Sequence, residues 1–299
     1  MSRAALRTCG PPRILLPMKR YVMTLRCPDR PGIIRAFAEG VVNASGNIVD
    51  NQQFSDVDTG TFCMRTEFDS PVDAVEQVEQ HLLTALDGFE PTLSVRAEAE
   101  RRRMLIMVSK FDHCLVDLLY RHSTGELPVE IPLVVSNHPD LRALVEHHGI
   151  PFVHLPVTRE TKTDAEARLL ALVEQHDVDF VVLARYMQVL SDDLCRALAG
   201  RVINIHHSFL PGFKGAKPYH QAYERGVKLI GATAHYVTAD LDEGPIIEQE
   251  VTRVTHAADP QALVALGRDT ERLVLSRAVR QHAEDRVLLI GPRTVVFGA

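Results

Sequence analysis

Residues 202–211 read Val-Ile-Asn-Ile-His-His-Ser-Phe-Leu-Pro, and residues 230–247 read Ile-Gly-Ala-Thr-Ala-His-Tyr-Val-Thr-Ala-Asp-Leu-Asp-Glu-Gly-Pro-Ile-Ile. Each stretch begins with apolar residues typical of a buried strand and leads into turn-forming residues. Side chains two residues apart lie on the same face of a strand, so Asn204 and His206 are predicted to point the same way. Asp242 follows the second strand in a loop, which can bring a carboxylate beside the imidazole of His206.

These side chains are suited to chemistry at a carbonyl group. The amide of Asn204 can donate to a developing oxyanion, and the imidazole of His206 can move a proton near neutral pH. Spacing alone favours a plainer interpretation, because histidines at strand ends more often serve packing and Asp-Glu-Gly is an ordinary turn composition. Spacing therefore raises the hypothesis of an Asn/His/Asp site without deciding it.

The order of these motifs resembles that of a known family. Asn204–Pro211, Gly231–Val237 and Leu241–Ile247 are similar to the signature of the formyltetrahydrofolate-dependent formyltransferase superfamily, and within it to the formyltetrahydrofolate deformylases. Gly267-Arg-Asp-Thr-Glu271 resembles the deformylase C-terminal region, so the resemblance extends over residues 18–299. It implies an enzyme that hydrolyses 10-formyltetrahydrofolate to tetrahydrofolate and formate, supplying formate to one-carbon and purine metabolism.

The resemblance also implies roles for individual residues. Carried over by position, the catalytic residues are Asn204, His206 and Asp242. The implied folate-binding residues are Arg185, Tyr186, Met187, Asp240 and Leu241. The alternative for the first of these segments is a tight turn with packed side chains. Which of His206 and Asp242 is the general base stays open, because burial raises and pairing lowers the pKa of a carboxyl group. Folate is the substrate, so no cofactor is expected.

The turn over residues 109–115, Ser-Lys-Phe-Asp-His-Cys-Leu, distinguishes between relatives. Relatives that formylate glycinamide ribonucleotide resemble this domain but carry a glycine-rich loop here, whose backbone N–H groups hold the phosphate of the acceptor. This turn contains no glycine, and Phe111 and Asp112 are expected to crowd or repel a phosphate. Water is then the simplest acceptor. The alternatives are a folate-dependent formyltransferase with an unidentified acceptor, and an amino-acid-sensing protein whose α/β half only binds.

A metal-dependent hydrolase is a lesser alternative. The candidate ligands are His206, His207, His220, His235 and Asp242. Adjacent histidines diverge on a strand, and no histidine pair has helical spacing, so no metal site is predicted. His207 is expected on the opposite strand face in a structural role, whereas packing and support of the site are equally open for His235. Lys214 and Lys217 are expected in a solvated loop.

Residues 18–98 are predicted to form a small module of their own. Apolar runs alternate between strand and helix periods in the order βαββαβ, which is a ferredoxin-like layout. The turn Asp29-Arg-Pro-Gly32 and the segment Gly46-Asn-Ile48 resemble those of an ACT domain, a module that commonly pairs across subunits and binds amino acids. The resemblance implies Asp29, Gly32 and Asn47 as effector-binding candidates, methionine and glycine as the first effectors to try, and a homo-oligomer, dimeric or tetrameric. That the module only supports assembly is an equal alternative.

The remainder of the chain has the pattern of a Rossmann-like α/β domain. Near-continuous apolar strands alternate with amphipathic helices from residue 104 onward, which predicts a mostly parallel sheet covered on both faces. The expected division is a disordered tail over 1–17, the ACT-like domain over 18–98, a charged linker over 99–103 and a formyltransferase-like catalytic domain over 104–299.

The composition limits the classes of function that remain possible for this chain. The formal net charge is −6, so no basic field predicts nucleic-acid binding. The five cysteines are scattered without a Cys-x-x-Cys pair, which favours a reducing compartment. Apolar runs are too short to span a membrane, and the apolar part of the first 17 residues is too short for a signal peptide. A cytoplasmic protein is expected.

Overall fold

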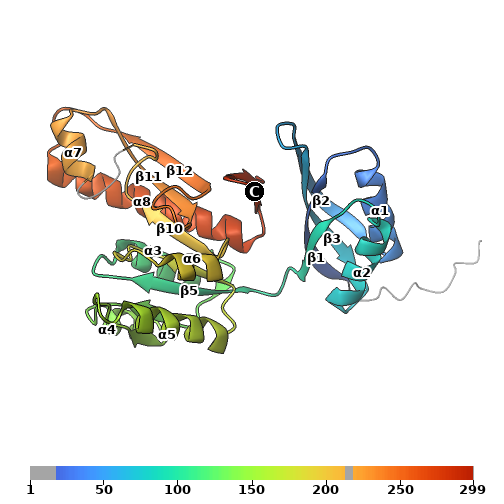
Figure 1. Cartoon of the computed structure of the whole chain (residues 1–299), viewed down its shortest axis with the longest axis horizontal. Coiled ribbons are helices and arrows are strands. Elements are labelled where there is room, and N and C mark those ends of the chain that lie inside the picture. Colours follow the sequence, from blue (N-terminus) through green and yellow to red (C-terminus); the bar gives the residue numbers. More distant parts are fainter. Residues whose placement is uncertain (1–17, 213–217, 299) are drawn as a thin grey trace, which may run out of the picture. The chain divides into compact units, whose positions relative to one another are not determined.

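The computed structural model describes residues 18–212 and 218–298, and the chain divides into two compact units after Ala99 (Figure 1). The tail expected over 1–17 and the lysines at 214 and 217 lie outside the described residues. Each unit has its own hydrophobic core. No helix in the described part of the chain is long and apolar enough to cross a membrane.

The N-terminal unit is an antiparallel sheet covered by two helices on one face. Its elements are β1 (Lys19–Pro28), α1 (Ile33–Asn43), β2 (Asn47–Asp56), β3 (Thr61–Ser70), α2 (Val75–Ala85) and β4 (Thr92–Ala97). The strand order is β2-β3-β1-β4, which confirms the predicted βαββαβ layout. Alternate residues of β1 and β3, such as Met23 and Phe68, pack against Phe37 of α1 and Leu82 of α2. The period-two pattern of the strands thus generates the core.

The second unit is built on an eight-stranded sheet. Its first half contains β5 (Arg102–Val108), α3 (His113–Ser123), β6 (Val129–Glu130), β7 (Val134–Ser136), α4 (Arg142–His147), β8 (Phe152–His154), α5 (Lys162–Gln175) and β9 (Phe180–Leu183). Its second half contains α6 (Asp192–Ala197), β10 (Val202–His206), α7 (Pro218–Glu224), β11 (Leu229–Tyr236), β12 (Ile246–Arg253), α8 (Pro260–Ala283), β13 (Val287–Ile290) and β14 (Arg293–Val296).

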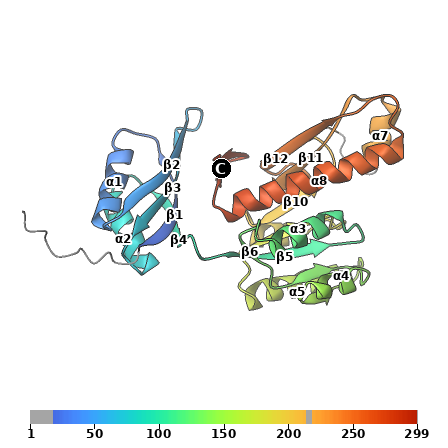
Figure 2. The same ribbon diagram turned by 180° about the vertical axis from the view of Figure 1, so that it is seen from behind.

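The sheet order is β12-β11-β10-β9-β5-β7-β8, with β6 paired to β5. The pairs from β8 to β10 are parallel, whereas β11 and β12 are antiparallel, so the predicted mostly parallel sheet is confirmed. One face packs against α3, α4 and α8, and the other against α5 and α6. Figure 2 shows α8 running along β10, β11 and β12. The sheet is therefore covered on both faces, as its continuous apolar strands require.

Two helix starts follow directly from the sequence. Asp259 caps α8 by accepting from the backbone N–H of Ala262, and Pro260 occupies the first turn. Ser191 caps α6 by accepting from the backbone N–H of Leu194 at 3.2 Å. The first cap fixes where α8 begins against β10–β12, and the second fixes the end of the loop that follows β9.

The linker expected over 99–103 is shorter in the structure, because β5 already begins at Arg102. The backbone N–H of Arg103 donates to the carboxylate of Asp179 at 2.7 Å, and the guanidinium of Arg102 pairs with Asp285 at 2.7 Å. These contacts bind both arginines to the second unit. Basic residues that looked like solvated linker are thus the first residues of the central strand.

Candidate active site

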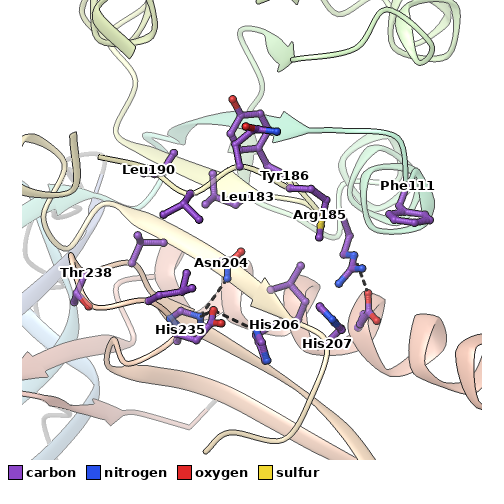
Figure 3. A pocket seen from close by; sticks show the side chains of 18 of the residues that line it. Phe111, Leu183, Arg185, Tyr186, Leu190, Asn204, His206, His207, His235 and Thr238 are labelled. Atoms are coloured by element: carbon purple, nitrogen blue, oxygen red, sulfur yellow. Dashed lines mark hydrogen bonds and ion pairs between the residues drawn. The ribbon is translucent and has the colours of Figure 1, made fainter. Parts of the chain in front are cut away.

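A cavity of about 530 Å³ lies where the loops after β5, β9 and β10 meet the loop over 237–243, α7 and α8. Its size is that of a site for a small organic molecule. Loops at the carboxyl ends of neighbouring parallel strands are where such sheets bind ligands. Figure 3 shows Asn204 and His206 of β10 near the middle of this cavity.

The three predicted catalytic residues converge in this cavity. His206 Nδ1 lies 3.2 Å from Asp242 Oδ1, and Asn204 precedes His206 by two residues on the same strand (Figure 3). His206 is 5% exposed, and the side chain of Asp242 is 12% exposed. An amide, an imidazole and a carboxylate therefore meet with little access to bulk water, where their electrostatic interactions are strong.

His235 belongs to the same cluster. Its Nε2 atom lies 3.2 Å from Asn204 Nδ2 and 3.7 Å from Asp242 Oδ1. Its Nδ1 atom lies 2.9 Å from the carbonyl oxygen of Tyr236, and since a carbonyl only accepts, Nδ1 carries the donated hydrogen. In neutral His235, Nε2 can then accept from the amide of Asn204. The His235 ring therefore supports the site. The sequence alone had left packing and support of the site equally open for this residue.

The pairing of β10 with β11 explains how His235 reaches the site. The strands are antiparallel, and Asn204 lies directly opposite His235 in the register. The chain then turns back across β11 to place Asp242, and Gly244 makes this return possible, because a Cβ atom there would lie 1.7 Å from the carbonyl oxygen of Tyr236. Asp242 itself has a φ of 57°, a left-handed conformation that is uncommon for a residue other than glycine.

The hydrogen bond from His206, with a further contribution from His235 at 3.7 Å, holds the pKa of Asp242 well below the ordinary range of an aspartate, although burial acts in the opposite direction. Asp242 is therefore a carboxylate at neutral pH, and it accepts rather than donates. On the other side of the imidazole, His206 Nε2 is buried and has no hydrogen-bond partner among the described residues. That nitrogen is free to exchange a proton with a bound molecule.

His207 does not lie where strand alternation predicts. The strand β10 ends at His206, so the alternation of faces ends there too, and the His207 ring stacks on the His206 ring at 5.1 Å and 26°. His207 lines the same cavity. Burial, together with the charge of Arg185, lowers the pKa of His207 to about 4, so this ring is neutral at pH 7. The expectation of a residue on the opposite face is wrong.

The five predicted folate-binding residues, Arg185, Tyr186, Met187, Asp240 and Leu241, all line the cavity. Arg185 has a φ of 64°, which marks a tight turn directly after β9. The Ser109 hydroxyl accepts from the backbone N–H of Met187 at 2.9 Å and donates to Asn137 at 2.7 Å. Tyr186 is packed, whereas the side chain of Met187 is half exposed. The turn is thus fixed by Ser109 while its residues face the cavity.

Glu271 had no predicted site role, yet it forms a hydrogen-bonded cluster at the other end of the cavity. This carboxylate of α8 is 1% exposed and accepts from Tyr219 Oη at 2.6 Å and from His113 Nε2 at 2.8 Å. Arg185 Nε lies 3.5 Å away. Burial raises the pKa of Glu271, but His113 and the charge of Arg185 outweigh it, so the net shift is downward. The feature of the sequence that could have identified Glu271 is a charged residue on the buried face of an amphipathic helix.

One group of side chains has the spacing of metal ligands. His113, Cys114 and Glu271 have ligand atoms within 4.8 Å of one another. Both oxygens of Glu271 already accept hydrogen bonds, and a guanidinium lies beside them, which is unfavourable for a cation. Burial also raises the pKa of the Cys114 thiol well above its usual range, away from the thiolate that binds metals. These residues fit a hydrogen-bond cluster better than a metal site.

The three effector-binding candidates of the N-terminal unit do not come together within that unit. Asp29 follows the last residue of β1, and Gly32, with a φ of 104°, precedes α1 at the same end of the sheet. Asn47 begins β2 and is in register, through Asp69, with Arg20 at the start of β1. The eight steps from Arg20 to Pro28, the end of β1, span about 26 Å. Asn47 therefore lies at the opposite end of the sheet.

Known proteins resemble this chain over nearly its whole length. The family described as Formyl transferase matches residues 102–279, which is more than half of the chain. A formyltetrahydrofolate deformylase from Corynebacterium sp. (strain P-1) is 52% identical over 280 residues, covering 93% of this chain and 98% of the relative.

Solved structures agree with this comparison. The crystal structure of formyltetrahydrofolate deformylase from Burkholderia mallei is 48% identical with a TM-score of 0.90, covering 94% of this chain and 100% of that one. Glycinamide ribonucleotide transformylase 1 from Symbiobacterium toebii is 30% identical with a TM-score of 0.63, covering 68% of this chain and 97% of that one. The deformylases named here match over 90% of the chain, and the chain belongs to the formyltetrahydrofolate deformylase family.

Proposed function

We propose that this chain hydrolyses 10-formyltetrahydrofolate to tetrahydrofolate and formate at Asn204, His206 and Asp242. The observation that carries the proposal is the convergence of an amide, an imidazole and an ionised carboxylate in a cavity large enough for a folate head group. Relatives named formyltetrahydrofolate deformylases match this chain over nearly its whole length. The formate released would supply one-carbon and purine metabolism.

In the proposed reaction, the formyl group on N10 lies against Asn204. One N–H of the amide is directed to His235, and the other can donate to the carbonyl oxygen as it becomes an oxyanion. His206 Nε2, which has no hydrogen-bond partner in the described part of the chain, is the second group that can reach this oxygen or the leaving nitrogen. The amide of Asn204 stabilises charge that develops only in the transition state.

The attacking nucleophile is water. As the water oxygen bonds to the formyl carbon, its proton passes to the His206–Asp242 pair, with Asp242 accepting it directly or through a second water. The bond from carbon to N10 then breaks, N10 takes up a proton, and formate leaves. His206 Nδ1 and Asp242 Oδ1 lie 3.2 Å apart, close enough for a proton to pass between them.

No resident cofactor or metal enters this scheme. The three side chains supply oxyanion stabilisation and proton transfer, which are the two needs of amide hydrolysis. We therefore propose an enzyme that requires neither, in which folate is the substrate.

The test is formate release from 10-formyltetrahydrofolate without any added acceptor and with a chelator present. We expect formate and tetrahydrofolate in equal amounts, and a loss of about 10³-fold or more in kcat for Asp242→Asn. Absence of formate release by the folded wild-type protein would overturn the proposal and direct attention to transfer onto an acceptor. Activity lost to the chelator would instead support a metal-dependent reaction.

For the N-terminal unit, we propose assembly into a homo-oligomer, dimeric or tetrameric, and binding of a small amino acid, with methionine and glycine as the first candidates. The exposed turn from Asp29 to Gly32 supports the second proposal, because it leaves polar groups accessible beside a helix start. Sedimentation and thermal shifts with each amino acid test the two. We also propose a cytoplasmic location, since the described cysteines, Cys27, Cys63, Cys114 and Cys195, are all free and buried.

A further inference from the structure

We propose that Phe111, held by Arg185 and Arg268 beside the Glu271 cluster, closes the acceptor end of the cavity, so that water and not an amine receives the formyl group. The proposal rests on the proposed function and names the residues that select its acceptor. It concerns the end of the cavity where Arg185, in the turn after β9, meets Phe111 and Glu271.

The cavity has two unlike ends on either side of the catalytic residues. Figure 3 shows Leu190 and Thr238 on one side of Asn204, and Phe111 and His207 on the other. The first end is lined by apolar side chains such as Leu183, Leu190 and Val237, which suit the flat rings of a folate. A second substrate would have to approach the formyl carbon from the other end.

Phe111 covers that other end. It lies in the glycine-free turn between β5 and α3, and its ring is 43% exposed. The guanidinium of Arg185 lies 5.4 Å from the ring centre, and that of Arg268 lies 5.9 Å from it. These cation–π contacts join the turn after β5 to the turn after β9 and to α8. The ring is therefore held at the cavity although it is partly exposed to water.

At this end of the cavity, both oxygens of Glu271 are occupied by neighbouring side chains. Glu271 accepts from Tyr219 and His113 and pairs with Arg185. Tyr219 packs against the bare backbone of α8 at Gly267, where a Cβ atom would lie 2.1 Å from its ring. Tyr219 is thus fixed by both packing and hydrogen bonding.

This arrangement discriminates against an amine in two ways. An attacking amine must lose a proton, and at this end the carboxylate of Glu271 is already engaged on both oxygens. An amine is also attached to the rest of its molecule, which would extend into the space that Phe111 covers. Water has no such extension and fits beside Asp242. One filled position in a pocket typically gives a discrimination of about tenfold or more.

The reaction that Phe111 suppresses is aminolysis. The amine nitrogen would bond to the formyl carbon and lose one proton, while the bond from carbon to N10 breaks and N10 gains one proton. The products are an N-formyl amine and tetrahydrofolate. No oxidant, reductant or further reactant is needed, so the competition depends only on which nucleophile reaches the carbon.

The test is the ratio of N-formylglycinamide to formate, measured by mass spectrometry with 10-formyltetrahydrofolate and added glycinamide, after subtraction of the reaction without enzyme. Both products come from the same active molecules, so the ratio does not depend on how much protein is folded. We expect the ratio to rise about tenfold or more in Phe111→Ala. Phe111→Tyr keeps the ring and is expected to keep the wild-type ratio.

Val189→Ala is the matched control, because Val189 is another partly exposed apolar residue that lines the cavity. Its ratio is expected to equal that of the wild type. An unchanged ratio in Phe111→Ala, with formate still released, would overturn the role of Phe111 and leave the proposed function intact. A rise of the same size in Val189→Ala would also overturn it. Failure of the wild type to release formate would overturn the proposed function itself.

Discussion

The predicted site residues lie close together in the second unit and far apart in the N-terminal unit. In the second unit, Asn204, His206 and Asp242 are joined through contacts of 3.2–3.7 Å that include His235. In the N-terminal unit, Asp29 and Gly32 lie at one end of the sheet and Asn47 lies at the other, about 26 Å away along the strands. Both sets come from motif resemblance, yet only the first converges within one chain.

The difference follows from sheet topology. In the second unit, antiparallel pairing sets Asn204 opposite His235, and a glycine lets the following loop fold back with Asp242. In the N-terminal unit, β2 begins at the end of the sheet where β1 also begins, so a turn before β2 cannot meet a turn after β1. Motif residues identify a site reliably only when register brings them to one place.

A large effect is expected for His206→Gln. Loss of the proton-transferring imidazole is expected to lower kcat for formate release by about 10³-fold, with a much smaller change in KM. Steady-state kinetics check this. His220→Gln, a change at a histidine of α7 that also lines the cavity, is the control and is expected to keep kcat within about threefold, as a side chain outside the reaction would. Equal losses of kcat in the two variants would contradict the distinction between residues that converge on the reaction and residues that only line the cavity.

A smaller effect is expected for His235→Phe. This change keeps a ring of similar size but removes the contacts to Asn204 and Asp242. We expect kcat to fall about 10- to 100-fold, because the residue positions the reacting groups without touching the formyl carbon. His235→Gln, which retains a polar group, is expected to recover part of the loss. An unchanged kcat in His235→Phe would show that His235 does not position the reacting groups.

Stability of the second unit is expected to depend on pH through His282. Burial lowers the pKa of His282 from 6.5 to about 4. Its Nδ1 atom lies 2.7 Å from the hydroxyl of Tyr236. Between these pH values the unfolded chain binds the proton and the folded chain does not. The free energy of unfolding therefore falls as pH drops from 6.5 to 4, by up to about 3 kcal/mol for one such group.

Denaturant unfolding at pH 7 and pH 4.5 checks this. His207, whose pKa is also lowered to about 4, contributes with the same sign. His282→Gln is expected to flatten the pH dependence by more than any change in the N-terminal unit. An unaltered slope in that variant would show that the buried imidazole does not carry the effect.

The smallest effects are expected from substitutions at the residues predicted to bind an effector. If the N-terminal unit binds glycine or methionine at the turn before α1, Asp29→Ala abolishes the thermal shift caused by that amino acid. Asn47→Ala is expected to leave the shift unchanged and to alter stability by no more than about 0.5 kcal/mol, as for an ordinary surface position. Loss of the thermal shift in both variants would contradict the separation of Asp29 from Asn47. One ligand could touch both residues only between two copies of the unit.

Much of this fold was predictable from local patterns. Period-two and helical spacing predicted the βαββαβ unit and the mostly parallel sheet. The linker boundary was misplaced because the contacts of Arg102 and Arg103 with Asp285 and Asp179 are long-range. Charge in a sequence does not reveal whether its partner is water or a distant side chain.

The site was predictable to a smaller extent. Strand periodicity placed Asn204 beside His206, but it failed at His207, because the strand ended one residue earlier than the alternation assumed. The return of Asp242 followed only from the family resemblance. The cluster around Glu271 could not be foreseen, since it requires α3, α7 and the turn after β9 to meet α8.

Oxygen-18 water identifies the acceptor of the formyl group most directly. The wild-type enzyme is supplied with 10-formyltetrahydrofolate and glycinamide in labelled water, and the formate is analysed by mass spectrometry. We predict that each formate released carries a single labelled oxygen and that N-formylglycinamide stays at the level seen without enzyme. Unlabelled formate, or a formyl group that passes mainly to glycinamide, would contradict hydrolysis at Asn204, His206 and Asp242.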